Sequence, residues 1–407
     1  INDKIISIFI ILCISFLIFF IMIYFNPITS LILTFLISGM WFNVSVGSFL
    51  NDYLWILKYI INFKINMPDI SQSIVLPIVY PVSSAILSYG FNLSYKLYTE
   101  NQDKQFLKAT FGNYISSDLV EQMYQNKTIP KLGGEQGYHT VIFSDVANFS
   151  SIAEELSAPE LVELLNEYLT EMTQIILNNG GTIDKYIGDA IVAFYGAPVK
   201  VENHEHKAIL SIIQMNNKLK ELRQKWVNDD KWSDLIVNMN HRIGINTGDL
   251  VTGNMGSSIQ MNYTCMGDTV NLAARLESGS KHWGINAQVP ETVMKVTKDD
   301  FIYRELGAIR VQGKKESINV YELICEKKHK NDSLNKLLIK FEEGRQLYLK
   351  RKWDDAIKVF NQSALLEDMS DKYRQTNPSL TYINICNEFK INSPNKDWDG
   401  VYDFKSK

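Results

Sequence analysis

Residues 139–145 read HTVIFSD and residues 182–195 read TIDKYIGDAIVAFY. The first segment is a short apolar run that closes with Asp145, which is typical of a buried strand. The second divides at Gly188-Asp189 into two strand-like halves, which predicts a tight β-hairpin. A strand end and a neighbouring hairpin turn can meet at one edge of a sheet. We therefore expect Asp145 and Asp189 to lie close together.

Helix-like and strand-like segments alternate around this pair. The expected helices are 158–178, 204–226 and 268–282, and the further expected strands are a second hairpin over 238–255, turning at 247–249, and a strand pair over 300–323. The helices are recognised by the helical spacing of their apolar residues. This order predicts an α+β domain over residues 135–325 with a mixed, mostly antiparallel sheet.

The N-terminal part has the composition of a membrane domain. No charged residue lies between Lys4 and Asp52. At about 1.5 Å rise per residue, this run can cross a roughly 30 Å hydrocarbon layer twice. Counting a second uncharged stretch, we expect about three transmembrane helices in residues 1–95, near 5–24, 28–50 and 70–95.

The charges after the third expected span suggest an orientation. Lys96, Lys104 and Lys108 form the positive flank that favours the cytoplasmic side. The sequence thus predicts a multi-pass protein of the cell membrane, in contact with lipid, with a helical connector over 96–134 and a cytoplasmic catalytic domain. Because the chain begins with Ile and three crossings put its start outside, we also expect a missing upstream extracytoplasmic sensor segment.

Residues 326–407 differ from the domain before them. Their apolar residues resemble one tetratricopeptide-like helix pair, followed by an irregular end; these are Phe341, Gly344, Tyr348, Trp353, Ala356, Ile357, Phe360, Ala364 and Leu365. A single repeat cannot bury its own apolar face. We therefore expect this short helical tail to pack on the catalytic domain or on a partner.

The overall composition excludes several classes of protein. The 407 residues carry a net charge of only -4, so no broad basic field is available for nucleic acid, and none is expected as a partner. Cys13, Cys265, Cys325 and Cys386 are scattered, which favours neither a disulfide framework nor a zinc site. A transporter or channel is disfavoured because the expected spans contain no charged residue.

The two aspartates suggest phosphoryl chemistry. Paired carboxylates can hold two divalent ions about 3.5–4 Å apart, which polarise the attacking oxygen and neutralise the leaving one. Hard oxygen ligands favour Mg²⁺ or Mn²⁺ as the cofactors. A lone Gly-Asp is more often an ordinary turn, so the surrounding residues must decide.

Three motifs in order surround these aspartates. Residues 143–149 read FSDVANF, residues 185–190 read KYIGDA and residues 266–276 read MGDTVNLAARL. Together they resemble the catalytic domain of class III nucleotidyl cyclases, of the membrane-bound bacterial adenylate cyclase type. The resemblance implies a ferredoxin-like α+β catalytic domain, preceded here by transmembrane helices and followed by the helical tail.

The resemblance also implies a role for each matching residue. Asp145 and Asp189 would bind the metal ions, with the backbone carbonyl of Val146 as a further ligand. The backbone N–H groups of Ala147, Asn148 and Phe149 would bind the β- and γ-phosphates. Lys314 matches the triphosphate-binding lysine of the family, although its neighbour Lys315 leaves that register open.

Two further positions would select the purine, and two would act in catalysis. Lys185 can donate to adenine N1 and Thr264 can accept from the N6 amino group, whereas guanine needs the opposite polarity; ATP is therefore the expected substrate. Asn271 and Arg275 share one helical face. In the family the asparagine orients the ribose and the arginine stabilises charge on the α-phosphate.

The expected reaction is attack of the ribose 3′-hydroxyl on the α-phosphorus, which gives 3′,5′-cyclic AMP and pyrophosphate. In this family the site is completed between two catalytic domains, and every expected residue type is present here, so a homodimer is implied. Two alternatives stay open: a guanylate cyclase, and a catalytically inactive cyclase-like module that binds nucleotide at the membrane.

Overall fold

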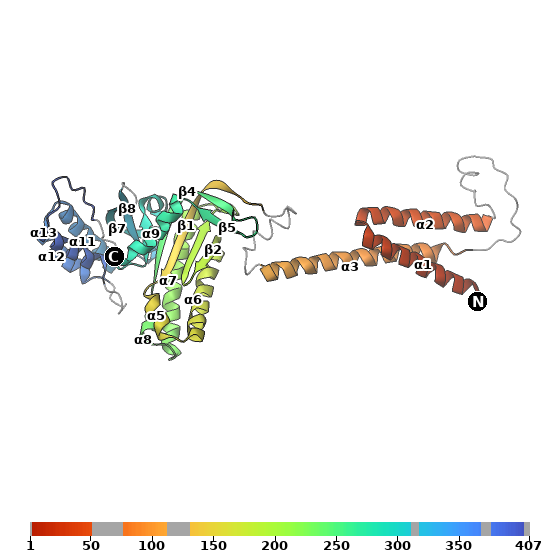
Figure 1. Ribbon diagram of the computed structural model, residues 1–407, viewed down its shortest axis with the longest axis horizontal. Helices are drawn as coiled ribbons and strands as arrows, with labels where there is room; N and C mark the ends of the chain where they lie inside the picture. Colours follow the sequence, from red (N-terminus) through yellow and green to blue (C-terminus); the bar gives the residue numbers. More distant parts are fainter. Residues whose placement is uncertain (1, 51–75, 112–130, 311–316, 368–375, 403–407) are drawn as a thin grey trace. The chain divides into compact units, whose positions relative to one another are not determined.

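The computed structural model describes residues 2–50, 76–111, 131–310, 317–367 and 376–402. They belong to two compact units, Ile1–Ser117 and Asp118–Lys407, which are considered separately. Figure 1 follows the elements from the N-terminal helices to the C-terminal ones.

Two helices of the N-terminal unit, α1 (Asn2–Tyr24) and α2 (Pro27–Leu50), are long and apolar enough to cross a membrane. Their boundary lies at Asn26, between the expected spans near 5–24 and 28–50. The Asn26 side chain accepts a hydrogen bond from the backbone N–H of Thr29 at 2.9 Å, which satisfies a donor at the start of α2. The first two expected spans therefore correspond to real helices.

The expected third span is not found among the helices of the described residues. The chain does form a helix there, α3 (Val79–Phe111), but its serine, tyrosine and asparagine side chains make it more polar than α1 and α2. It packs against the other two helices, and the Tyr89 hydroxyl donates to the Pro27 carbonyl at 3.0 Å. The first part of the expected connector is a continuation of α3, while residues 112–130 lie outside the described part.

The larger unit is built on one eight-stranded sheet. Its strands are β1 (Gly133–Val146), β2 (Gly181–Ile187), β3 (Ala190–Tyr195), β4 (His241–Gly256), β5 (Met261–Met266), β6 (Ala287–Pro290), β7 (Phe301–Arg310) and β8 (Ser317–Glu326). The order is β2-β3-β1-β4-β6-β8-β7, with β5 paired to β4. Among the strand pairings of the described residues, only that of β4 with β6 is parallel, which confirms the mixed, mostly antiparallel sheet.

Helices cover both faces of this sheet. They are α5 (Phe149–Glu155), α6 (Ala158–Asn178), α7 (His204–Asn228), α8 (Asp234–Val237), α9 (Asp268–Trp283), α10 (Glu291–Thr297) and the 3₁₀ turn Lys327–His329. Alternate residues of β1 serve the two faces. Ile142 lies in the main core with Tyr168 of α6 and Ile212 of α7, whereas Val141 packs with Ala273 of α9.

The second expected hairpin, over 238–255, is wrong. β4 runs without a turn through residues 247–249 and pairs with β1 along its length, from Gly133 opposite Asn254 to Val146 opposite His241. This continuous ladder satisfies the backbone groups that a turn at 247–249 would have left unpaired. The true hairpin joins β4 to β5 and turns at residues 257–260.

Gly244 of β4 allows α9 to lie directly on the sheet. A Cβ atom at this position would come within 2.2 Å of both the Ala273 carbonyl oxygen and the Glu277 backbone nitrogen. A side chain there would therefore push α9 away from β4. Because α9 also carries Asn271 and Arg275, this contact fixes the position of the backbone from which those two side chains project.

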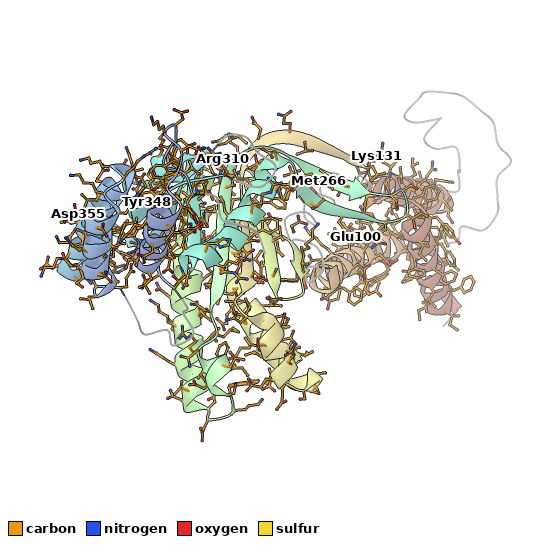
Figure 2. The ribbon with its side chains drawn as sticks, turned by 60° about the vertical axis from the view of Figure 1, so that its left-hand side comes forward. Glu100, Lys131, Met266, Arg310, Tyr348 and Asp355 are labelled. Carbon is orange, nitrogen blue, oxygen red and sulfur yellow. The ribbon has the colours of Figure 1, made fainter. Side chains whose placement is uncertain are left out.

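The tail forms three helices in its described part, α11 (Asp332–Leu349), α12 (Trp353–Ala364) and α13 (Pro378–Ile391). They pack on the catalytic domain: Phe341, Tyr348 and Phe360 share a buried cluster with Leu276 and Trp283 of α9. Tyr348 lies among these C-terminal helices in Figure 2. The apolar face of the expected helix pair is thus covered by the chain itself.

Candidate active site

Asp145 and Asp189 meet at one edge of the sheet. Asp145 is near the end of β1, and the pairing of β3 with β1 brings the β2–β3 turn beside it. Gly188 occupies that turn with φ +66°, a left-handed conformation that glycine adopts readily. The buried Asp189 carboxylate accepts a hydrogen bond from the Val146 backbone N–H at 3.0 Å.

The two carboxyl groups influence each other's charge. Burial, followed by a hydrogen bond with Asp145 and repulsion from it, raises the pKa of Asp189 to about 6. A carboxyl whose pKa is raised in this way lacks a sufficient positive neighbour. The edge therefore has the electrostatic character of a cation site.

Arg242 is a site residue that the sequence motifs do not reveal. It lies directly opposite Asp145 on β4 and donates to its carboxylate at 2.7 Å, while its Nε donates to Glu277 of α9 at 3.0 Å. The only signal that identifies it is the register of β1 against β4. Its guanidinium is half-buried between two carboxylates, and their charges raise its pKa against the opposing effect of burial.

The donor set at this edge fits a hard divalent cation. Carboxylate oxygens are the ligands that Mg²⁺ and Mn²⁺ prefer, and two of them converge here. A bound cation would compete with Arg242 for Asp145. The described residues contain no cluster of three His, Cys, Asp or Glu side chains, so the Val146 carbonyl and substrate oxygens would have to complete the coordination.

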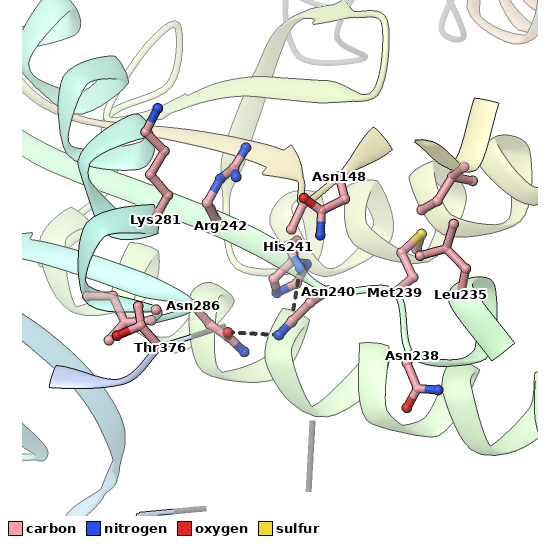
Figure 3. Close-up of a pocket in the computed structure, with 14 residues that line it drawn as sticks. Asn148, Leu235, Asn238, Met239, Asn240, His241, Arg242, Lys281, Asn286 and Thr376 are labelled. Carbon is pink, nitrogen blue, oxygen red and sulfur yellow. Dashed lines mark hydrogen bonds between the residues drawn. The ribbon is translucent and has the colours of Figure 1, made fainter. Parts of the chain in front are cut away.

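The three expected phosphate-binding amides are not equivalent. The Ala147 N–H donates to the Asn240 carbonyl at 2.8 Å and is therefore engaged within the fold, contrary to our expectation. Asn148 and Phe149 stand at the start of α5, where N–H groups have no partner in their own helix. A pocket opens beside Asn148, lined among others by Arg242 and Lys281 (Figure 3).

The two expected purine-selecting residues come together around a third. Thr264 of β5 donates its hydroxyl to Asp184 of β2 at 2.7 Å, and the Lys185 ammonium lies 3.4 Å from the other oxygen of the same carboxylate. Thr264 is buried, whereas the Lys185 side chain is 46% exposed. The sequence motifs do not single out Asp184.

Asn271 and Arg275 are exposed on α9. Neither side chain makes a hydrogen bond or an ion pair with any residue in the described part of the chain, so both are available to a ligand from outside this fold. Lys314 falls among residues 311–316, which lie outside the described residues. Its expected role therefore stays a prediction.

A buried polar network supports the edge from below. Tyr168 lies 3.0 Å from His241 Nδ1, and His241 Nε2 lies 2.7 Å from the Asn216 side-chain oxygen. Burial lowers the pKa of His241 to about 3, so the ring is neutral near pH 7. In that state Nε2–H donates to Asn216 and Nδ1 accepts from Tyr168, which orients the residue next to Arg242.

Comparison with known proteins places this geometry in a family. Residues 135–324 match the adenylate and guanylate cyclase catalytic domain. The chain is 29% identical over 218 residues to adenylate cyclase 1 of Rhizobium meliloti, covering 53% of this chain and 32% of that protein. It is 31% identical over 244 residues to the adenylate cyclase of Anabaena cylindrica, covering 59% of this chain and 46% of that protein.

Solved structures of an adenylyl cyclase and of a guanylyl cyclase are also similar to this chain. The adenylyl cyclase CyaB from P. aeruginosa is 33% identical, with 49% of this chain and 100% of that chain covered and a TM-score of 0.44. The guanylyl cyclase Cya2 is 28% identical, with 49% and 98% covered and a TM-score of 0.43.

The chain spans less than half the length of these two curated relatives, at 32% and 46%. The similarity concerns one domain. This domain contains the sheet, the edge that holds Asp145 and Asp189, and helix α9. Residues 135–324 of this chain form a catalytic domain of the class III adenylate and guanylate cyclase type.

Proposed function

We propose that this chain is an adenylate cyclase, which converts ATP to 3′,5′-cyclic AMP and pyrophosphate with two divalent metal ions. The observation that carries the proposal is the convergence of Asp145 and Asp189 at one sheet edge, where the pKa of Asp189 is raised to about 6. Two such carboxylates stabilise each other poorly unless a cation joins them. That arrangement suits a site that binds a metal–triphosphate complex.

The metal ions would be held by Asp145, Asp189 and the Val146 carbonyl, and they would activate the 3′-hydroxyl and neutralise the leaving pyrophosphate. The protein's own groups would do the rest. The amides of Asn148 and Phe149 and the Arg242 guanidinium would bind phosphate oxygens. Arg242 becomes available for this when a cation takes its place beside Asp145.

ATP is favoured over GTP by the groups around Lys185 and Thr264. An ammonium and a hydroxyl that accepts match the N1 acceptor and N6 donor of adenine. The same pair would face guanine O6 and N1–H with the wrong polarity, which a site of buried polar groups rejects strongly. The relatives named adenylate cyclase agree with this choice.

The active form would be a homodimer with two equivalent sites. In the described part of the chain, Asp189 contacts Val146 and Thr264 contacts Asp184, whereas the exposed Asn271 and Arg275 side chains have no hydrogen-bond or ion-pair partner. A second copy could bring one protomer's Asn271 and Arg275 to the partner's carboxylates. A two-fold arrangement would create both sites at once.

The N-terminal unit would anchor the enzyme in the cell membrane. The exposed surfaces of α1 and α2 carry many large apolar side chains, among them Phe9, Phe16 and Phe35. Such a surface is stable against lipid and unstable against water. We place the catalytic domain in the cytoplasm, because Lys96 and Lys104 lie in the second half of α3, between the apolar helices and the catalytic domain in the sequence.

The direct test is turnover by the detergent-solubilised full chain. With Mg²⁺ or Mn²⁺, we expect cyclic AMP from ATP and much less cyclic GMP from GTP, identified by product mass. Asp145→Asn should abolish turnover while thermal unfolding stays cooperative. Product from GTP alone would indicate a guanylate cyclase, and no product from either nucleotide would favour an inactive module.

The shared site has its own test. Asp145→Asn should be inactive alone and Arg275→Ala should keep only about 1% of the wild-type rate, but a mixture in equal amounts should regain activity, because half of the dimers then contain one intact site. Random exchange predicts about a quarter of the wild-type rate. If the mixture stays inactive although exchange is demonstrated, the site lies within one protomer.

A further inference from the structure

Asp184 is a buried carboxylate that the proposed chemistry does not use. Its side chain is only 2% exposed, although it belongs to β2 at one end of the sheet order. The register of β2 against β3 shifts between Ile183 and Lys185, so Asp184 is the extra residue of a β-bulge. A bulge turns a residue out of the regular alternation, and here the carboxylate reaches β5.

The contacts of Asp184 determine the orientation of the Thr264 hydroxyl group. Its Oδ2 accepts the Thr264 hydroxyl at 2.7 Å and lies 3.5 Å from the Cys265 backbone nitrogen. Its Oδ1 has no hydrogen bond in the described part of the chain but lies 3.4 Å from the Lys185 ammonium. An ionised carboxylate has no hydrogen to give, so the Thr264 hydroxyl must be the donor. A threonine has one hydroxyl hydrogen, and what remains on its oxygen can only accept.

We infer that Asp184 is a positioning residue for purine selection: it takes the only hydroxyl hydrogen of Thr264 and keeps the Lys185 ammonium beside the oxygen that remains. The inference rests on the proposed function, since it concerns the choice between ATP and GTP at that site. The Thr264 oxygen can then accept from the amino group of adenine, and the Lys185 ammonium can donate to adenine N1. Guanine presents a carbonyl to the oxygen and an N1–H to the ammonium, so both contacts are unfavourable.

The shared partner supports this reading. Lys185 and Thr264 contact the two oxygens of one carboxylate, so Asp184 links both side chains. Two groups linked through one carboxylate can contact neighbouring atoms on one edge of a purine. Without Asp184, the Thr264 hydroxyl could rotate and offer its hydrogen, which would suit guanine O6 as well.

A purely structural role for Asp184 predicts something different. If the carboxylate only links β2 to β5, its loss should lower kcat/KM for ATP and for GTP by the same factor. If it orients Thr264, its loss should change the preference between them. In Asp184→Asn the side chain keeps its size, but its amide group can donate to the Thr264 oxygen and free the hydroxyl hydrogen.

The experiment compares nucleotide preference in four variants of the full chain in detergent. We measure kcat/KM for ATP and GTP, and the dissociation constants of 3′-deoxy-ATP and 3′-deoxy-GTP, which lack the attacking hydroxyl. The variants are Asp184→Asn, Thr264→Val, the double substitution, and Asp299→Asn as a matched control at an exposed turn aspartate.

The inference predicts that Asp184→Asn lowers the ATP-to-GTP preference about 10-fold or more, the size expected for one misdirected hydrogen bond. Asp299→Asn should leave it unchanged. In the Thr264→Val background, Asp184→Asn should change the preference far less, because the hydroxyl that it orients is gone and only the ion pair with Lys185 is left to lose.

Other outcomes separate this inference from the proposed function. An unchanged preference in Asp184→Asn, or an equal loss for both nucleotides, overturns the inference and leaves the adenylate cyclase proposal standing. A wild-type chain that binds 3′-deoxy-ATP selectively but makes no product overturns only the activity. A wild-type preference for GTP overturns both.

Discussion

Buried charges are paired differently in two regions. One is the sheet edge that holds Asp145 and Asp189, called the aspartate edge, and the other is the tail contact, where the C-terminal helices pack on the catalytic domain. Where the tail packs on the catalytic domain, the buried Arg304 guanidinium contacts Glu322 and Glu367 on both sides, and Ser379 donates to Glu367 at 2.8 Å. At the aspartate edge, Asp189 faces a second carboxylate and its pKa is raised to about 6. The first arrangement is complete within the chain, and the second is complete only when something binds.

The difference separates parts that hold the fold from parts that act. Charges that satisfy one another stabilise packing, and removing one partner is costly because the others stay buried. Charges left incompletely paired lower stability, and they are tolerated where a ligand completes them. Substitutions at the two places should therefore affect different measurements.

The largest effect is expected at the aspartate edge. Asp189→Asn should lower kcat by about 1,000-fold or more, because a neutral amide is a poor ligand for a divalent cation. The same change removes repulsion from Asp145, so the free energy of unfolding without metal should stay equal or rise by about 0.5–1 kcal/mol. Denaturant unfolding with a chelator measures this, and a clear loss of stability would contradict the comparison.

The tail contact should show the reverse pattern. Arg304→Met leaves Glu322 and Glu367 buried without their cation, which should lower the free energy of unfolding by about 3–5 kcal/mol. The ATP-to-GTP preference of the folded protein should not change. Lys340→Met serves as the control, since its exposed pair with Glu343 on α11 should contribute less than about 1 kcal/mol. Equal effects of the two substitutions would mean that the Arg304 cluster has no structural role.

Arg275 tests whether exposure without a partner marks a functional residue. Arg275→Ala should lower kcat about 100-fold, as expected for loss of one group that stabilises transition-state charge, with a smaller change in KM. Thermal unfolding should be unaffected, because the side chain is exposed and forms no hydrogen bond or ion pair with any described residue. A lowered unfolding temperature with normal turnover would assign Arg275 to the fold instead.

The smallest effect is a pH dependence of stability. The folded-state pKa of His241 is lowered to about 3, below its usual 6.5. As pH falls below about 6.5, the unfolded chain binds a proton that the folded chain excludes, so stability is lost by at most about 1.4 kcal/mol per pH unit. His241→Gln should remove this contribution, which unfolding curves at pH 7 and pH 5.5 can measure. If the free energy of unfolding changes equally with pH in the wild type and in His241→Gln, His241 does not contribute to the pH dependence of stability.

Local patterns predicted much of the fold. The apolar run ending at Asp145 and the Gly188-Asp189 turn each involve neighbours in the chain, and both elements formed where expected. Helix spacing likewise located α6 and α9. The turn predicted at 247–249 failed, because pairing of β4 with β1 satisfies the same backbone groups over a longer stretch.

The sequence by itself determined which residue types the site contains and the order in which they occur. Only the tertiary structure decided their partners. Arg242 meets Asp145 from 97 positions away, and Asp184 meets Thr264 across 80 positions. Such contacts depend on strand register and on a β-bulge, which are set by the whole sheet and leave no periodic signal along the chain.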